Sequence, residues 1–151
     1  MKLTDETQTS ENWFEALALW NRVANWSHYG TSQSELTRQI KSLLLFLWNE
    51  KDWLKTEHPS QKKYIEAFVN DSTHIKVVAD LANTIKHRKL TNPPRSEAQQ
   101  TNYFGRIEFG SGKSREMYYV ETGNNQVKEV FSIIKGALEE YDELHRTLRK
   151  P

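Results

Sequence analysis

Three side chains that are suited to acid–base chemistry, Asp80, Asn83 and His87, recur at helical spacing in the stretch Ile75–Leu90. At about 100° per residue they form a narrow polar stripe with Lys76. An imidazole can accept and donate protons near neutral pH, and a carboxylate and an amide can hold it in place. The spacing favours contacts from Asp80 to Asn83 and from Asn83 to His87 over a direct contact across two turns. The stripe is therefore a candidate catalytic site.

The same stripe has a simpler interpretation as the solvated side of a helix. Opposite it lies an apolar face, made of Val78, Leu81, Ala82 and Ile85. Every amphipathic helix has such a polar side, and this stripe lies where solvent is expected. A site would instead require the three side chains to be polar and shielded. Periodicity alone leaves both interpretations open.

Basic residues that are suited to bind a phosphate backbone follow the stripe. These candidate nucleic-acid-binding residues are Lys86, Arg88, Lys89, Arg95, Arg106, Lys113 and Arg115. A basic loop beside a histidine could contact RNA phosphates. The alternative is a helix end that carries cations to match its dipole, next to a solvated hairpin. The formal net charge of +1 favours no nucleic-acid, membrane or acidic partner, so such a partner depends on local charge.

Several kinds of site are excluded or disfavoured by the sequence. The segment GSGKS at Gly110–Ser114 lacks the first glycine of a phosphate loop and lies between two expected strands. The five histidines show no H-E-x-x-H spacing, and the chain has no cysteine, so we expect no metal. We also find no motif for a serine nucleophile. We therefore expect no cofactor.

The hydrophobic pattern predicts a mainly α fold, with a bundle of four or five helices and a β-hairpin inserted before the long C-terminal helix. The helices are expected at about 11–29, 33–55, 61–70, 73–89 and 126–149, and the strands at 103–109 and 115–122. Thr9 or Ser10 is expected to cap the first helix, and Ser60 the third. A lone hairpin is marginally stable in water, so this one must pack on a helix or on another copy.

The chain is expected to form a single helical-bundle domain over residues 10–151, preceded by a flexible tail over residues 1–9. The first residues are polar and acidic and lack the apolar core of a signal peptide, so we expect a cytoplasmic protein. The longest apolar run, Leu43–Trp48, is far shorter than the ~20 residues that span a bilayer. We expect no association with membranes.

The order of polar residues from Asp80 to Leu90 resembles a D-x-x-N-x-x-K-H-x-x-L signature of small uncharacterised bacterial proteins, over about residues 60–150. Its N-x-x-x-H core also resembles a variant of the motif of the HEPN superfamily, helical-bundle proteins of which many are ribonucleases. Asn83 and His87 match the polar and histidine positions of that motif. The arginine position of the motif falls on Ala82.

This resemblance implies an RNA-associated protein of bacterial defence, toxin–antitoxin or stress type, and a homodimer that pairs through the tryptophan-rich helices or the motif helix. Cleavage through a 2′-hydroxyl needs a proton acceptor, a proton donor and a cation for the phosphorane charge. Because Ala82 replaces the arginine, we expect RNA binding more than cleavage; any cleavage would be that of a metal-independent ribonuclease. The alternative is a non-catalytic helical module that binds a protein partner or a small ligand, with the stripe structural.

Overall fold

A computed structural model describes residues 10–25, 33–87, 98–108, 114–122 and 127–149 of the chain. Residues 1–9, predicted as a tail, lie outside this part. The elements in the described part are α1 (Glu11–Ala24), α2 (Gln33–Glu57), the 3₁₀ turn η3 (Pro59–Gln61), α3 (Lys62–Asp71), α4 (Ile75–His87), β1 (Ala98–Glu108), β2 (Ser114–Thr122), β3 (Val127–Glu129) and α5 (Val130–Arg149).

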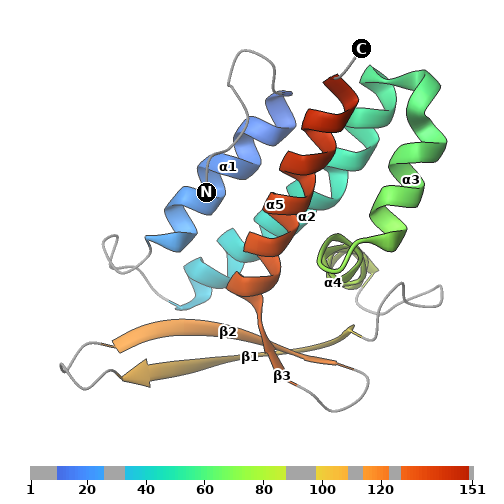
Figure 1. Cartoon of the computed structure of the whole chain (residues 1–151). Helices are drawn as coiled ribbons and strands as arrows, with labels where there is room; N and C mark the ends of the chain where they lie inside the picture. The colour runs from blue at the N-terminus through green and yellow to red at the C-terminus, as the bar shows by residue number, and fades with distance from the viewer. Residues whose placement is uncertain (1–9, 26–32, 88–97, 109–113, 123–126, 150–151) are drawn as a thin grey trace.

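The helices form a bundle, and an antiparallel sheet lies across one end of it (Figure 1). In Figure 1, α1, α2 and α5 run alongside one another, whereas α4 is seen nearly end-on between α5 and α3. In the sheet, β2 lies between β1 and β3. β1 packs against α4 and β2 against α5, as a hairpin that is marginal by itself requires. The predicted mainly α bundle with a hairpin before the last helix is confirmed.

The start of α1 follows from a side-chain cap. The Ser10 hydroxyl accepts a hydrogen bond from the backbone N–H of Trp13 at 3.1 Å, as the sequence predicts. The Asn12 side chain donates to the carbonyl of Phe46 at 2.9 Å and so ties α1 to α2. α1 ends at Ala24, earlier than the predicted Tyr29.

One predicted helix start and one predicted helix cap are wrong. The last helix begins at Val130, not Gln126, because residues 127–129 form β3 on the open edge of β2. The Glu129 carboxylate then caps α5, accepting from the backbone N–H of Phe131 at 2.5 Å and of Ser132 at 3.0 Å. Ser60 lies within η3 and does not cap α3, whose N-cap residue is Gln61 and makes no capping hydrogen bond through its side chain.

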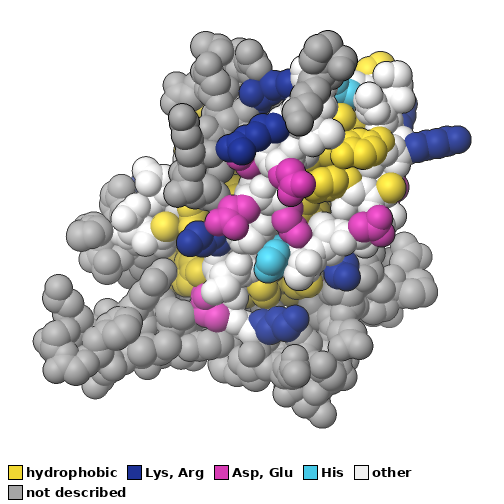
Figure 2. Space-filling view, in the orientation of Figure 1, with side chains coloured by type: hydrophobic (Ala, Val, Ile, Leu, Met, Phe, Trp, Pro, Cys, Tyr) yellow, Lys and Arg dark blue, Asp and Glu magenta, His cyan; other side chains and the backbone are white. Residues whose placement is uncertain are grey.

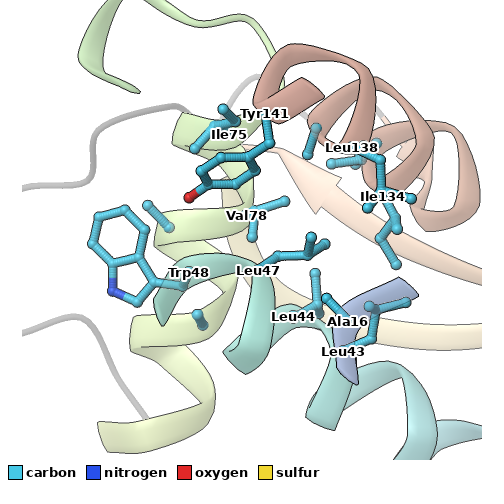
Figure 3. Packing of buried hydrophobic residues seen from close by; sticks show 14 of the residues in the cluster. Ala16, Leu43, Leu44, Leu47, Trp48, Ile75, Val78, Ile134, Leu138 and Tyr141 are labelled. Atoms are coloured by element: carbon cyan, nitrogen blue, oxygen red, sulfur yellow. The ribbon is translucent and has the colours of Figure 1, made fainter. Parts of the chain in front are cut away.

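α4 lies at the centre of the bundle. It packs against α2, α5, β1 and α3, whereas α1 packs mainly on α2. The predicted apolar face is buried at Val78, Leu81 and Ala82 but only partly buried at Ile85. Figure 3 shows Val78 between Tyr141 of α5 and Leu47 of α2. Side chains of α2 and α5 therefore cover this face of α4.

The N-terminus of α4 is held by a side chain of α5. The Glu140 carboxylate accepts from the backbone N–H groups of Thr73, His74 and Ile75 at 2.8–2.9 Å. The first backbone N–H groups of a helix have no acceptor within the helix, and the Glu140 carboxylate supplies one here. One turn earlier on α5, Gly136 leaves room for the His74 ring, since a Cβ at residue 136 would lie 2.4 Å from that ring.

Gly136→Ala is expected to lower the free energy of unfolding by about 1–2 kcal/mol, because the new methyl group would overlap the imidazole of His74. Urea unfolding followed by circular dichroism measures this change. His74→Ala in the same chain should remove most of the penalty. A Gly136→Ala protein as stable as the wild type would show that the ring does not pack there.

Candidate functional site

Asp80, Asn83 and His87 lie on a single uninterrupted helix, with His87 as the last residue of α4. The Asp80 side chain is 1% exposed, and Asn83 is partly buried. The side chain of His87 lies outside the described part. The solvated-face interpretation is therefore wrong for Asp80, which lies inside the protein.

The burial of Asp80 follows from the position of α4, which has packed elements on several sides. A buried carboxylate is costly unless it is hydrogen-bonded or paired. Asp80 does take part in a polar or electrostatic interaction within the chain. Its neighbour Ala79 is fully buried too, so α4 has apolar contacts well beyond the face that the sequence predicts.

The position at which the HEPN motif has its arginine is a core position in this protein. Ala82 is 0% exposed and belongs to the main hydrophobic cluster. An arginine there would place a charge in the core, which is costly without a partner. The packing of α4 thus gives a physical reason for a small apolar residue at position 82.

The predicted basic cluster is only partly described. Lys86 is in the last turn of α4, Arg106 is on β1 and Arg115 is on β2. Arg106 pairs in register with Glu116, and Arg115 pairs with Ile107. Because adjacent positions of a strand belong to opposite faces, the positions of the two arginines lie on opposite faces of the sheet. Arg88, Lys89, Arg95 and Lys113 lie outside the described residues.

A buried polar cluster that the sequence analysis missed joins α1, α2 and α5. Glu50 is 0% exposed and accepts a hydrogen bond from the Ser10 hydroxyl at 2.8 Å. His145 is 6% exposed, and its Nε2 lies 3.5 Å from a Glu50 oxygen. The Trp13 indole meets the His145 ring edge-on, with centroids 4.6 Å apart. We call these residues the Glu50–His145 cluster. Their contacts connect α1, α2 and α5.

Tyr141, Trp13 and His145 each bring a buried polar atom to this cluster. The Tyr141 hydroxyl, the Trp13 indole nitrogen and His145 Nδ1 form no hydrogen bond within the described part of the chain. Burial, followed by the negative charge of Glu50, raises the pKa of Tyr141 well above its ordinary range. The polar backbone of Lys51 lowers the pKa of Tyr141 and so offsets part of this rise. It nevertheless does not form a hydrogen bond with the Tyr141 hydroxyl. Tyr141 therefore stays a neutral phenol.

Tyr141→Phe is expected to leave stability unchanged at pH 7 or raise it by up to about 1 kcal/mol, because it removes a buried hydroxyl without a partner. The unfolded chain loses the tyrosine proton above pH ~10 while the folded protein keeps it, so wild-type stability should fall as pH rises above that value. The free energy of unfolding should fall by up to ~1.4 kcal/mol per pH unit. Denaturant titrations between pH 8 and 12 measure it.

The matched control for the pH experiment is Tyr64→Phe, since Tyr64 is 42% exposed. It should keep the alkaline loss of stability, whereas Tyr141→Phe should reduce it. Equal slopes in all three proteins would contradict the buried, neutral state of Tyr141.

The periodicity of the sequence contains the signal for this cluster. Glu50 lies three residues after Leu47 and seven after Leu43, on the core stripe of α2. His145 lies four residues after Tyr141, on the core stripe of α5. A polar residue in phase with a core stripe indicates a buried polar contact.

Within the described ranges, no group of three or more histidine or acidic side chains is arranged to hold a metal ion. In the same residues, no helix is long and apolar enough to cross a membrane. No protein-family model, no curated protein and no solved structure matches the chain.

Proposed function

We propose that the protein is a HEPN-like RNA-associated protein, in which the C-terminal end of α4 and the adjoining hairpin bind RNA. The observation that carries the proposal is the shielding of Asp80 on the helix that also bears Asn83 and His87. A carboxylate held inside the fold can fix the neighbouring polar groups, and a rigid helix suits a binding constellation better than a loop.

The arrangement of neighbouring elements supports this surface. β1 packs against α4, so the strand that bears Arg106 adjoins the helix that bears Lys86 and His87. Phosphate contacts from lysine and arginine supply most of the affinity in sequence-independent RNA binding. Since Arg106 and Arg115 occupy opposite faces of the sheet, at most one of them serves the same RNA surface.

Binding is favoured over cleavage by the core position of Ala82. A fully buried alanine offers no cation for the charge of a pentavalent phosphorane. If cleavage does occur, His87 would act as acid or base without a metal, and a basic side chain elsewhere would supply the cation. The biological role implied is bacterial defence, toxin–antitoxin function or stress response.

A homodimer and a cytoplasmic location belong to the same proposal. Of the two predicted dimer surfaces, the tryptophan-rich helices are favoured, because α4 is already covered by elements of its own chain. Trp53 on α2 is 44% exposed and Phe14 on α1 is 51% exposed, whereas Trp13 is fully buried. Light scattering of the wild type and of a Trp53→Ala variant tests this arrangement.

His87→Ala is expected to weaken RNA binding by about 5- to 20-fold, in line with the loss of roughly 1–2 kcal/mol from one polar contact. Filter binding with a short single-stranded RNA at low salt measures the affinity, and a gel of the same RNA detects cleavage. His58→Ala is the matched control, because His58 lies at the start of η3, well outside α4.

The two function hypotheses give opposite results in this experiment. If the stripe is structural, His87→Ala should lower the melting temperature and leave RNA affinity as low as that of an unrelated protein. The alternative function, a helical module that binds a protein or small ligand, would then be favoured. Cleavage by the wild type that His87→Ala abolishes would instead establish a ribonuclease.

A further inference from the structure

A pocket with aromatic and acidic walls lies between α3 and α5, beside the start of α4. It has a volume of about 330 Å³, and Tyr64, Phe68, Asp71, Thr73, Glu140 and Glu143 are among its lining residues. In Figure 2, hydrophobic side chains are exposed between α5 and α3, with acidic side chains on both sides. The volume lies at the lower end of the range for small-ligand sites.

The aromatic wall is formed by two rings of α3. Tyr64 is 42% exposed, and its ring centroid lies 6.4 Å from that of Phe68, with the ring planes tilted by 47°. Phe68 is partly buried, so the two neighbouring rings form a continuous aromatic wall of which Tyr64 is the exposed part. The faces of such rings attract organic cations within about 6 Å of the centroid.

The acidic wall carries charge that no described side chain neutralises. The side chains of Asp71 and Glu143 form no hydrogen bond or ion pair within the described residues, and both residues are exposed. No basic side chain is among the described residues that line the pocket. Glu140 contributes less, because its carboxylate already accepts three backbone N–H groups of the α4 start.

The aromatic wall and the acidic wall together favour an organic cation over a metal ion or an anion. A metal ion would need three or more close oxygen or nitrogen ligands from the protein, and the described residues form no such group. An anion would be repelled by Asp71 and Glu143. A flat or elongated cation can lay its hydrocarbon part on the rings while its charge faces the carboxylates.

We propose that the pocket between α3 and α5 binds an organic cation that bears a guanidinium or primary ammonium group. The cation belongs either to a free small amine or to an arginine or lysine side chain of a polypeptide. The site lies at the N-terminal end of α4, whereas His87 is the last residue of that helix. It is thus separate from the proposed RNA surface and does not depend on it.

The test is a titration of the ¹⁵N-labelled protein followed by NMR, at low salt. Two probes separate the sources: agmatine, a small amine, and the blocked peptide Gly-Arg-Gly. The peptide Gly-citrulline-Gly is the neutral control, because citrulline has nearly the shape of arginine without its charge. A dissociation constant on the order of 1 mM is expected, since the contacts are exposed.

The expected result is a saturable shift of backbone amides in residues 64–73 and 140–143 with at least one charged probe. Tyr64→Ala and Glu143→Gln should each weaken binding about fivefold or more. Glu139→Gln and Phe14→Ala are matched controls and should leave binding unchanged, because Glu139 and Phe14 do not line the pocket. Stronger binding of agmatine favours a free amine, and stronger binding of the arginine peptide favours a polypeptide.

Three results would overturn the proposal. The first is no saturable shift with either charged probe. The second is equal binding of the citrulline peptide, which would remove the role of charge. The third is an equal loss in Glu139→Gln, which would show general attraction to an acidic surface. Because Tyr64 and Glu143 are exposed, their variants should stay folded, and circular dichroism checks this.

Discussion

Val78→Asp is expected to unfold the protein at room temperature. Val78 is 0% exposed and lies between Tyr141 and Leu47 in the centre of the bundle (Figure 3). A carboxylate placed there loses its hydration without gaining a partner, at a cost of about 4 kcal/mol or more. That is comparable with the whole stability of many domains. Circular dichroism and the dispersion of amide NMR signals measure the loss of structure.

The matched control for this substitution is Ala18→Asp, at an exposed position of α1, which should stay folded. Ile85→Asp should be milder than Val78→Asp, because Ile85 is only partly buried. A cooperative, stable Val78→Asp protein would contradict the central position of α4.

Glu140→Ala is expected to lower the free energy of unfolding by about 2–3 kcal/mol. The substitution removes the acceptor of the Thr73, His74 and Ile75 amides and leaves the buried Ile75 amide without that partner. Urea unfolding measures the total effect. Hydrogen exchange at these three amides measures the local effect on the start of α4. In the variant, these amides should exchange faster than the amides of α5.

The control for Glu140→Ala is Glu139→Ala, which changes the same charge on an exposed position of α5. It should alter stability by less than about 0.5 kcal/mol. Glu140→Gln should lie between the two, because its single carbonyl oxygen can accept fewer of the three hydrogen bonds. Equal effects of all three substitutions would contradict a specific cap.

Local signals in the sequence are sufficient to predict most of the fold. Periodicity places α2 and α3 within two residues of their observed ends, and Ser10 identifies the start of α1. β3 is missed because Val127 and Val130 also fit the apolar stripe of a helix. Only the open edge of β2, which is a tertiary feature, makes residues 127–129 a strand.

The site is less predictable, because burial depends on which elements meet. Helical periodicity places Asp80 on the polar side of α4, and that side is solvated only if nothing packs there. In this protein α4 is packed against α2, α3, α5 and β1. Asp80 is therefore buried and not solvated. The pocket between α3 and α5 joins residues about 70 positions apart, and no local pattern indicates it.

The anchoring of α4 on α5 has a consequence for the order of folding. The amides at the start of α4 find their acceptor, Glu140, 65 to 67 residues later in the chain. Closing a flexible loop of that length costs about 4 kcal/mol of chain entropy. At ~5–20 residues per second, a ribosome needs roughly 3–13 s to synthesise the intervening segment. During that interval α4 lacks the Glu140 carboxylate and the α5 wall over Val78, so the nascent chain exposes a core helix to chaperones until α5 emerges.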